Sequence, residues 1–295
     1  MATYKTYDTI GIREDLQDAI YDISPTTTPF MSTVGRTKAK NTYHEWQTDS
    51  LADVNLDNAQ IEGADATSAV LTPTTRVGNY TQISDKVVQV STTDDVVDKA
   101  GRSTETAYQL SKASAEIKRD MESILLSDQA QSAGKADEAR KLGGLASWIT
   151  TNTVDTAGGA LTEDMLKEAV LKAYTAGGEP DVLLVSPANK QVVSTFAGIA
   201  EQRYQAPKSS ATTIIGAADV YLSDFGSLSV VPDRFLSDDF SYVLDPSMAS
   251  VAYLRPFKSQ KLAKMGDSEK HLLNVEYTLV VNNEAAHAMM SDETP

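Results

Sequence analysis

A polar stretch from Thr48 to Thr74 constrains this chain most, because it separates two strand-like segments. The segment before it, Asn41 to Gln47, puts Tyr43 on one side and Trp46 on the other, as in a strand. The segment after it, residues 75–91, is again rich in β-branched and aromatic side chains. A structureless loop of about 27 residues is unusual inside a compact domain, and an isolated two-stranded ribbon is only marginally stable. The pattern therefore predicts a long two-stranded excursion that a neighbouring subunit supports.

The first 40 residues are predicted to form an arm. A short helical pattern, with Leu16, Ile20 and Ile23 on one side, is followed by a segment that contains Pro25 and Pro29. Two prolines so close together force extended geometry on their neighbours. Such a segment buries little against itself, so we expect it to be loose or to lie along another surface.

The longest helical pattern runs from Gly101 to about Gln131, with Ser103 as the expected N-cap. At roughly 1.5 Å per residue this helix would be about 40 Å long, which suits a spine rather than an ordinary domain helix. A single long helix of any α/β protein would give the same pattern. The apolar residues recur at steps of three and four: Ala107, Leu110, Ala113, Ile117, Met121, Ile124 and Leu125.

An α/β block follows the spine helix. Thr162 is the expected N-cap of a helix that ends at Gly177-Gly178, and Ser186 with Pro187 is expected to begin a second helix. Between them, Asp181–Ser186 is predicted to be a fully buried strand. Further strands are predicted at Val220–Ser223, Leu228–Pro232, Tyr242–Asp245, Ser250–Leu254 and Leu273–Val281.

Composition excludes several classes of protein. The 295 residues include no cysteine, which rules out disulfides and thiolate metal sites, and the three histidines, His44, His271 and His287, are scattered. No apolar run approaches the roughly 18–20 residues that cross a bilayer, and residues 1–22 lack the apolar core of a secretory signal. The net charge of -15 should repel nucleic acid. This charge serves either to keep the protein soluble or to make a wall to which nucleic acid does not adhere.

The search for catalytic chemistry finds none. The glycine pairs at residues 143–144, 158–159 and 177–178 fit turns better than phosphate cradles. Asp94-Asp95 and Asp238-Asp239 lie near turns, and sequence neighbours point apart on a strand. We therefore expect no enzyme, no catalytic residue, no cofactor-binding residue and no metal ligand. One basic cluster, Arg36, Lys38 and Lys40, is expected to contact an acidic neighbour, since every copy carries surplus negative charge.

Three stretches carry a resemblance to a known family: Val34–Trp46, Asp224–Arg234, and Leu254–Pro256 followed by Leu262–Ser268. With the order of elements, they make the chain similar to the major capsid proteins of tailed bacteriophages, whose fold is shared with encapsulins and herpesvirus capsid floors. The resemblance implies an α+β fold with an N-terminal arm, an extended two-stranded loop, a spine helix in a peripheral domain, and an α/β axial domain.

The resemblance also implies segment boundaries. The arm would comprise residues 1–40 and the extended loop, a β-hairpin lying over the neighbouring subunit, residues 41–91. The peripheral domain would combine residues 92–145 and 246–295, and the axial domain would span residues 146–245. Some relatives join loop lysines covalently to neighbouring subunits, but residues 48–75 contain no lysine, so we do not expect this crosslink here.

The implied function is structural: hexamers and pentamers of one subunit would form the icosahedral head shell, enclosing double-stranded DNA without sequence-specific binding. Only about 40 residues precede the first strand, so a separate scaffolding protein is expected. A portal is a further expected partner, a decoration protein is a candidate one, and assembly would occur in the host cytoplasm. Three alternatives remain open at this point: an encapsulin-like compartment, another phage structural protein such as a tail or decoration subunit, and a hydrolase with an unfamiliar site.

Overall fold

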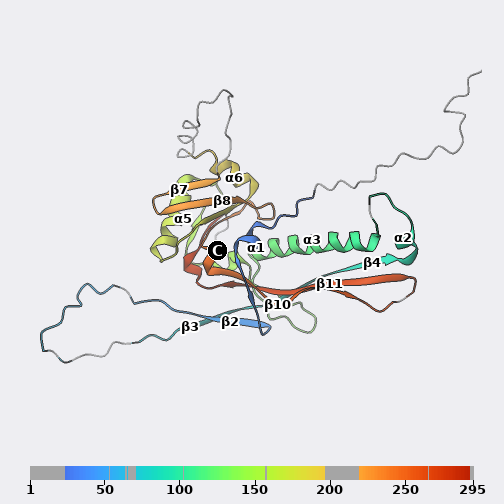
Figure 1. The fold of residues 1–295 in the computed structure, drawn as a ribbon. Coiled ribbons are helices and arrows are strands. Elements are labelled where there is room, and N and C mark those ends of the chain that lie inside the picture. Colours follow the sequence, from blue (N-terminus) through green and yellow to red (C-terminus); the bar gives the residue numbers. More distant parts are fainter. Residues whose placement is uncertain are drawn as a thin grey trace, which may run out of the picture.

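The computed structural model describes residues 24–52, 54–63, 65, 71–101, 103–156, 158–196, 219–264 and 266–292. The helical pattern expected at residues 16–23 lies outside these ranges. Figure 1 shows an elongated body built on a long helix, a rounded α/β body at one end of it, and a hairpin that projects away from both. The two are called the spine body and the α/β body below.

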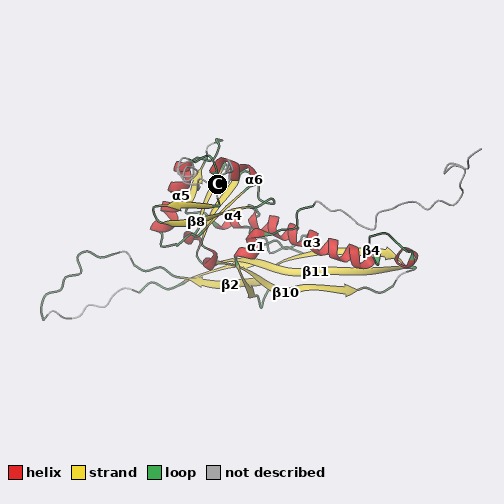
Figure 2. Ribbon diagram, turned by 45° about the horizontal axis from the view of Figure 1, so that its top comes forward, coloured by secondary structure: helices red, strands yellow, loops and turns green. Residues whose placement is uncertain are grey.

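The spine body places helix α3 (Glu105–Leu126) on one face of a four-stranded sheet. The order of its strands is β1-β10-β11-β4, with β1 parallel to β10 and the other pairs antiparallel. Figure 2 shows β10 and β11 running along the length of this body. The strand bounds are Gly35–Lys38 for β1, Gln82–Ser91 for β4, Ala249–Lys261 for β10 and Ser268–Val281 for β11.

Helix α3 has the expected apolar stripe but is shorter than expected. Ile117, Met121 and Leu125 are at most 1% exposed and face the sheet residues of the main core. Its 22 residues give a length of about 33 Å at roughly 1.5 Å each. The N-cap is Thr104 rather than Ser103, and the helix ends at Ser127, whose extended backbone stops the hydrogen-bond ladder.

The α/β body contains a six-stranded sheet in the order β5-β12-β9-β6-β8-β7. The expected caps are confirmed: Thr162 accepts a hydrogen bond from the Met165 N–H, and Ser186 accepts one from the Asn189 N–H. The expected buried strand β6 is buried at every position. The bounds are Thr153–Asp155 (β5), Glu163–Thr175 (α5), Val182–Val185 (β6), Pro187–Val193 (α6), Val220–Ser223 (β7), Gly226–Pro232 (β8), Phe240–Leu244 (β9) and Ala288–Ser291 (β12).

Short elements complete the described fold. The hairpin pairs β2 with β3 in antiparallel register from Tyr43↔Tyr80 to Thr48↔Thr75. The bounds are Pro29–Thr33 (α1), Tyr43–Thr48 (β2), Thr75–Tyr80 (β3), Thr92–Val96 (α2), Leu145–Trp148 (α4), Pro246–Met248 (η3) and Glu284–Ala286 (η4).

Strand pairing corrects three of the expected boundaries. Residues 29–38 of the arm fold onto the spine body, because Phe30 and Met31 are buried in its core and β1 extends its sheet. The expected loop 41–91 is a hairpin only over β2 and β3, since β4 pairs with β11 and packs against α3. The expected peripheral segment 246–295 is divided: residues 249–281 lie in the spine sheet, but β12 pairs with β5 and β9 of the α/β body.

One hydrophobic core joins the two bodies. It combines α3 side chains and spine-sheet residues with Leu184, Tyr242 and Leu244 of the α/β body. The buried Tyr242 hydroxyl donates a 2.7 Å hydrogen bond to the Leu126 carbonyl at the end of α3. A second core lies on the other side of the six-stranded sheet, under α5. The end of α3 is therefore part of the interior of both bodies.

Replacing Leu125 with alanine should lower the free energy of unfolding by about 2–5 kcal/mol, because the side chain is fully buried where the bodies meet. Urea unfolding of the unassembled subunit measures this loss. Lys118→Ala, on the exposed side of the same helix, is the matched control and should change the value by less than about 0.5 kcal/mol. Equal losses for the two variants would contradict the shared core.

Candidate subunit interface

The root of the hairpin is fixed to the body by buried polar contacts. Asn79 is 0% exposed, and its amide nitrogen donates to the carbonyls of Gly143 and Leu279, at 3.1 and 2.9 Å. Its amide oxygen accepts the Gly143 N–H at 2.8 Å. On the partner strand, the ring of Trp46 lies 5.4 Å from that of Trp148, centroid to centroid. Because the Asn79 amide is fully bonded within the chain and the two indole rings pack together, the root holds its direction without help from another chain.

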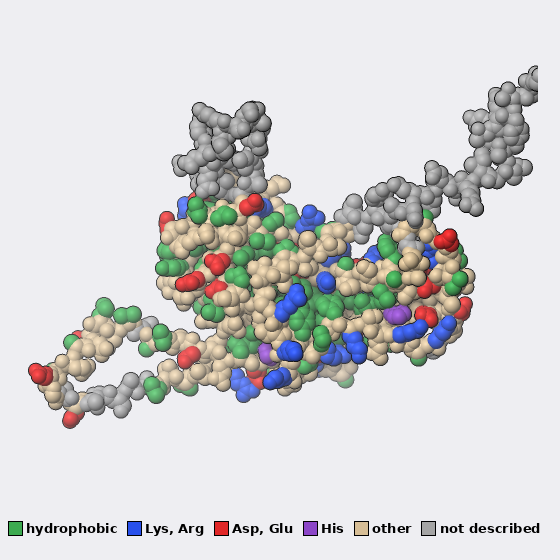
Figure 3. Space-filling model, in the orientation of Figure 1, with side chains coloured by type: hydrophobic (Ala, Val, Ile, Leu, Met, Phe, Trp, Pro, Cys, Tyr) green, Lys and Arg blue, Asp and Glu red, His purple; other side chains and the backbone are tan. Residues whose placement is uncertain are grey.

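The tip of the hairpin has the opposite character. Five large apolar side chains are each more than 80% exposed there: Leu51, Val54, Leu56, Ile61 and Leu71. Residues 49–74 contain five acidic residues and no lysine, arginine or histidine. Figure 3 shows these apolar and acidic side chains on a loop that stands clear of both bodies. Exposed apolar side chains gathered on one projecting loop mark an interaction surface.

Lysines and arginines gather on the spine body, along its lower margin in Figure 3. The predicted cluster of Arg36, Lys38 and Lys40 lies on and just after β1, which is an edge strand of the spine sheet. Lys258 lies further along the neighbouring strand β10. All four side chains are exposed, and within the described ranges none of them forms an ion pair. We call these four residues the basic edge.

Glu276 fastens the segments behind the hairpin. Its carboxylate accepts hydrogen bonds from Thr81 at 2.8 Å and Arg255 at 2.7 Å, and it also pairs with Arg140. Arg140 belongs to the loop after α3 and donates to the Thr81 carbonyl as well. Burial alone would raise the pKa of Glu276, but the Thr81 and Arg255 hydrogen bonds and the charges of both arginines together lower it. The sequence predicts the strand that carries Glu276, but not the burial of this side chain, because the loop that covers it is distant in sequence.

The predicted acidic pairs are structural. Asp95 accepts the Thr106 N–H at 3.0 Å and so caps α3, and this hydrogen bond lowers the pKa of Asp95. Asp94 pairs with Lys99 at 3.3 Å. Asp238 and Asp239 are exposed in the turn before β9, where the Asp238 carbonyl accepts a hydrogen bond from Asn189.

The three histidines do not come together. His44 lies on the hairpin, His271 on β11, and His287 before β12, where burial lowers its pKa and its Nδ1 accepts the Asp245 N–H. Over the described ranges, no three side chains of His, Cys, Asp or Glu are gathered closely enough to hold a metal ion. No helix in those ranges is both long and apolar enough to span a bilayer.

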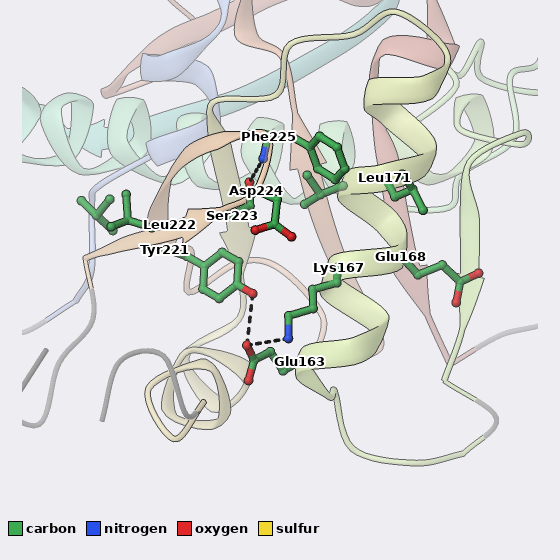
Figure 4. A pocket seen from close by; sticks show the side chains of 11 residues that line it. Glu163, Lys167, Glu168, Leu171, Tyr221, Leu222, Ser223, Asp224 and Phe225 are labelled. Atoms are coloured by element: carbon green, nitrogen blue, oxygen red, sulfur yellow. Dashed lines mark hydrogen bonds and ion pairs between the residues drawn. The ribbon is translucent and has the colours of Figure 1, made fainter. Parts of the chain in front are cut away.

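A cavity of about 400 Å³ lies between α5 and β7 (Figure 4). Leu171, Leu222 and Phe225 supply its apolar lining. Its main polar groups are paired with one another: Glu163 binds Lys167 at 3.0 Å and accepts a hydrogen bond from the Tyr221 hydroxyl at 3.3 Å. Within the described lining apolar side chains predominate, so the cavity is an apolar surface hollow.

Solved structures define the class of protein to which this fold belongs. The capsid of Cyanophage A-1(L) has a TM-score of 0.69 over 99% of both chains, at 13% identity. The holo-SrpI encapsulin of Synechococcus elongatus PCC 7942 has a TM-score of 0.61 over 99% of this chain and 96% of its own, at 14% identity. The fold is therefore that of phage capsid proteins and encapsulins, as the sequence predicted.

Sequence comparison decides between them. The family model for the SU10 major capsid protein matches residues 2–294. The major capsid protein of Escherichia phage Phieco32 is 30% identical over 97% of this chain and 96% of the relative. The chain belongs to the SU10 major capsid protein family and is a structural subunit of a phage capsid shell, so its place is the virion. The predicted family is confirmed, and the encapsulin shares only the fold.

Replacing Glu276 with glutamine should lower the free energy of unfolding by about 2 kcal/mol at pH 7, because two arginines lose a buried counter-charge and both are partly exposed. A carboxyl with a lowered pKa in the folded state stabilises it above the unfolded pKa, and this contribution is lost as pH falls through the folded value. In urea unfolding, the free energy of unfolding of E276Q should therefore fall less on acidification than that of the wild type.

Glu168→Gln is the control for this prediction, since Glu168 pairs with Lys172 in an exposed i,i+4 position on α5. It should change stability by less than about 0.5 kcal/mol. If E276Q behaved like this control, Glu276 would not hold the hairpin root.

Proposed function

We propose that copies of this chain assemble as pentamers and hexamers into a closed icosahedral shell around double-stranded DNA. The α/β body serves as the axial domain and the spine body as the peripheral domain. The observation that carries the proposal is the hairpin, whose root is hydrogen-bonded to its own chain through Asn79 and whose apolar tip is exposed. Such a tip is stable only when another surface covers it.

The basic edge of a neighbouring copy is the surface that fits this tip. The tip carries only acidic charges. Within the described residues, the four basic side chains of the edge form no ion pair. The tip of one subunit and the basic edge of another, Arg36, Lys38, Lys40 and Lys258, therefore attract each other. Burying each apolar side chain of the tip contributes about 1.5–3 kcal/mol before the cost of ordering the loop is subtracted. Because the contact repeats around a closed shell, modest pairwise affinities suffice.

The acidic balance supports a wall that does not bind the genome. A net charge of -15 on every copy repels phosphate, and the basic edge is neutralised by the neighbouring tip. We propose that the shell encloses DNA without sequence-specific contacts. The chain has no enzymatic role in this proposal, in line with its structural family.

Other partners follow from assembly. A separate scaffolding protein guides closure, a portal occupies a vertex, and a decoration protein is a candidate partner on the outer surface. Assembly takes place in the host cytoplasm, where a chain without cysteines needs no oxidising environment.

Reversing charge at the tip tests the proposed contact. The variant D57K/E62K should fold normally but give at least about tenfold fewer closed shells, because two attractive pairs become repulsive. Negative-stain microscopy and size-exclusion chromatography count shells against free subunits, with the scaffolding protein co-expressed. The exchange variant D57K/E62K/K38E/K40E should recover part of the yield.

Glu179→Lys, an exposed change in the α/β body, is the control and should leave the shell yield unaltered. A normal shell yield from D57K/E62K would contradict the proposed contact between tip and basic edge, but it would not contradict assembly into a shell. If the wild type formed tubes or isolated small oligomers, the proposal of a closed icosahedral shell would be wrong.

A further inference from the structure

Two carboxylic side chains are buried where the arm segment, the spine helix and the α/β body meet, since Glu122 bonds the arm segment and Phe235 of the loop after β8 packs on Arg119 of α3. Glu122 lies on α3 and Asp233 directly follows β8, and each is 0% exposed. Neither forms an ion pair with a basic side chain in the described part of the chain. Two ionised carboxylates without counter-charge are costly to bury together, so one of them tends to hold a proton.

Glu122 holds the arm segment. Its Oε1 accepts the Phe30 N–H at 2.6 Å and its Oε2 accepts the Met31 N–H at 3.0 Å. The first turn of α1 has no cap of its own, because the side chain of Thr28 makes no capping hydrogen bond and Pro29 has no N–H. A side chain about 90 residues away in sequence therefore supplies the missing acceptors.

Asp233 belongs to the α/β body and is incompletely bonded. Its Oδ1 accepts the Phe235 N–H at 2.8 Å, and its own N–H donates to the Val185 carbonyl at 2.8 Å. Its Oδ2 is buried and has no hydrogen-bond partner. A buried acceptor without a donor is unfavourable, and a proton held between the two carboxyl groups would supply that donor.

We infer that Glu122 and Asp233 share one proton, which latches the arm segment and the spine helix to the α/β body. With the proton in place, one carboxyl group donates to the other and Glu122 still accepts both N–H groups of α1. Without it, two negative charges face each other in a water-poor interior and repel. The loop after β8 then separates from α3, while α1 stays with the helix that caps it.

Within the described ranges, none of the surrounding basic groups forms an ion pair with either carboxyl group. On α3, the Arg119 guanidinium lies over the Phe235 ring, 5.8 Å from its centroid. On β10, burial raises the pKa of the Tyr253 phenol. The charge of Arg36, on β1, acts to lower the pKa of the same phenol. The loop after β8 also carries Arg234, Asp238 and Asp239, all exposed, and α1 has no titratable side chain.

The direction of the pH response follows from these surroundings. Burial and then the Asp233 charge raise the pKa of Glu122 to about 8, against the two N–H donations, and burial also raises the pKa of Asp233. A group whose pKa is higher when the junction is closed favours the closed state fully below its ordinary pKa. That contribution is lost as pH rises through the closed-state value, so the latch opens on the alkaline side.

Hydrogen exchange of the full chain between pH 6.5 and 9.5 tests the latch. After correction for intrinsic exchange, protection of residues 233–240 should fall by up to about tenfold per pH unit above pH 8, whereas residues 29–34, which stay with α3, should keep theirs. In E122Q and D233N an amide replaces the shared proton as donor, so protection there should be independent of pH. Glu105→Gln, at a second buried glutamate of α3, is the control and should keep the wild-type response.

A wild type without this loss of protection, or glutamine and asparagine variants that keep it, would overturn the inference. Infrared spectroscopy of the wild type decides the matter even if both variants fail to fold. A protonated-carboxyl band at pH 6.5 that disappears above pH 8 supports the shared proton, and its absence at pH 6.5 rejects it. Neither measurement depends on shell assembly.

Discussion

The subunit depends above all on the burial of one apolar stripe of α3. Ile117, Met121 and Leu125 complete the core beneath the four-stranded sheet. The same core continues into the α/β body, where the Tyr242 hydroxyl reaches the carbonyl at the end of the helix. Because side-chain packing is dense and directional, this shared core, rather than the connecting segments, sets how the two bodies lie relative to each other.

The hairpin separates folding from assembly. At its root, Asn79 and Glu276 have their polar groups satisfied by the same chain, so the root is part of the folded subunit. At its tip, the apolar side chains that the structure describes are exposed to water. The energy for forming the subunit and the energy for joining subunits are therefore held by different residues, and a shell can form without refolding its parts.

Local pattern predicted the elements whose signals are local. The capped helices α5 and α6, the buried strand β6 and the stripe of α3 all followed from spacing and caps. The outer part of β10 was missed because residues 255–261 are largely polar and are held as a strand by pairing with β11, which no local pattern reveals. Residues 48–74 were predicted only as a polar stretch, so the apolar side chains exposed at the tip were not anticipated. The contacts of Glu122 and Glu276 join residues roughly 90 to 195 positions apart, which no local pattern reveals.

Glu276 and Glu122, both buried, show how one residue type can have opposite roles. Glu276 is surrounded by Thr81 and two arginines, which keep it ionised and fix the hairpin root whatever the pH near neutrality. Glu122 faces another carboxyl group and two backbone donors, so its charge is conditional on a proton. The first arrangement suits a contact inside one body. The second lies where two bodies and the arm meet, and a conditional charge there makes their arrangement adjustable without altering either core.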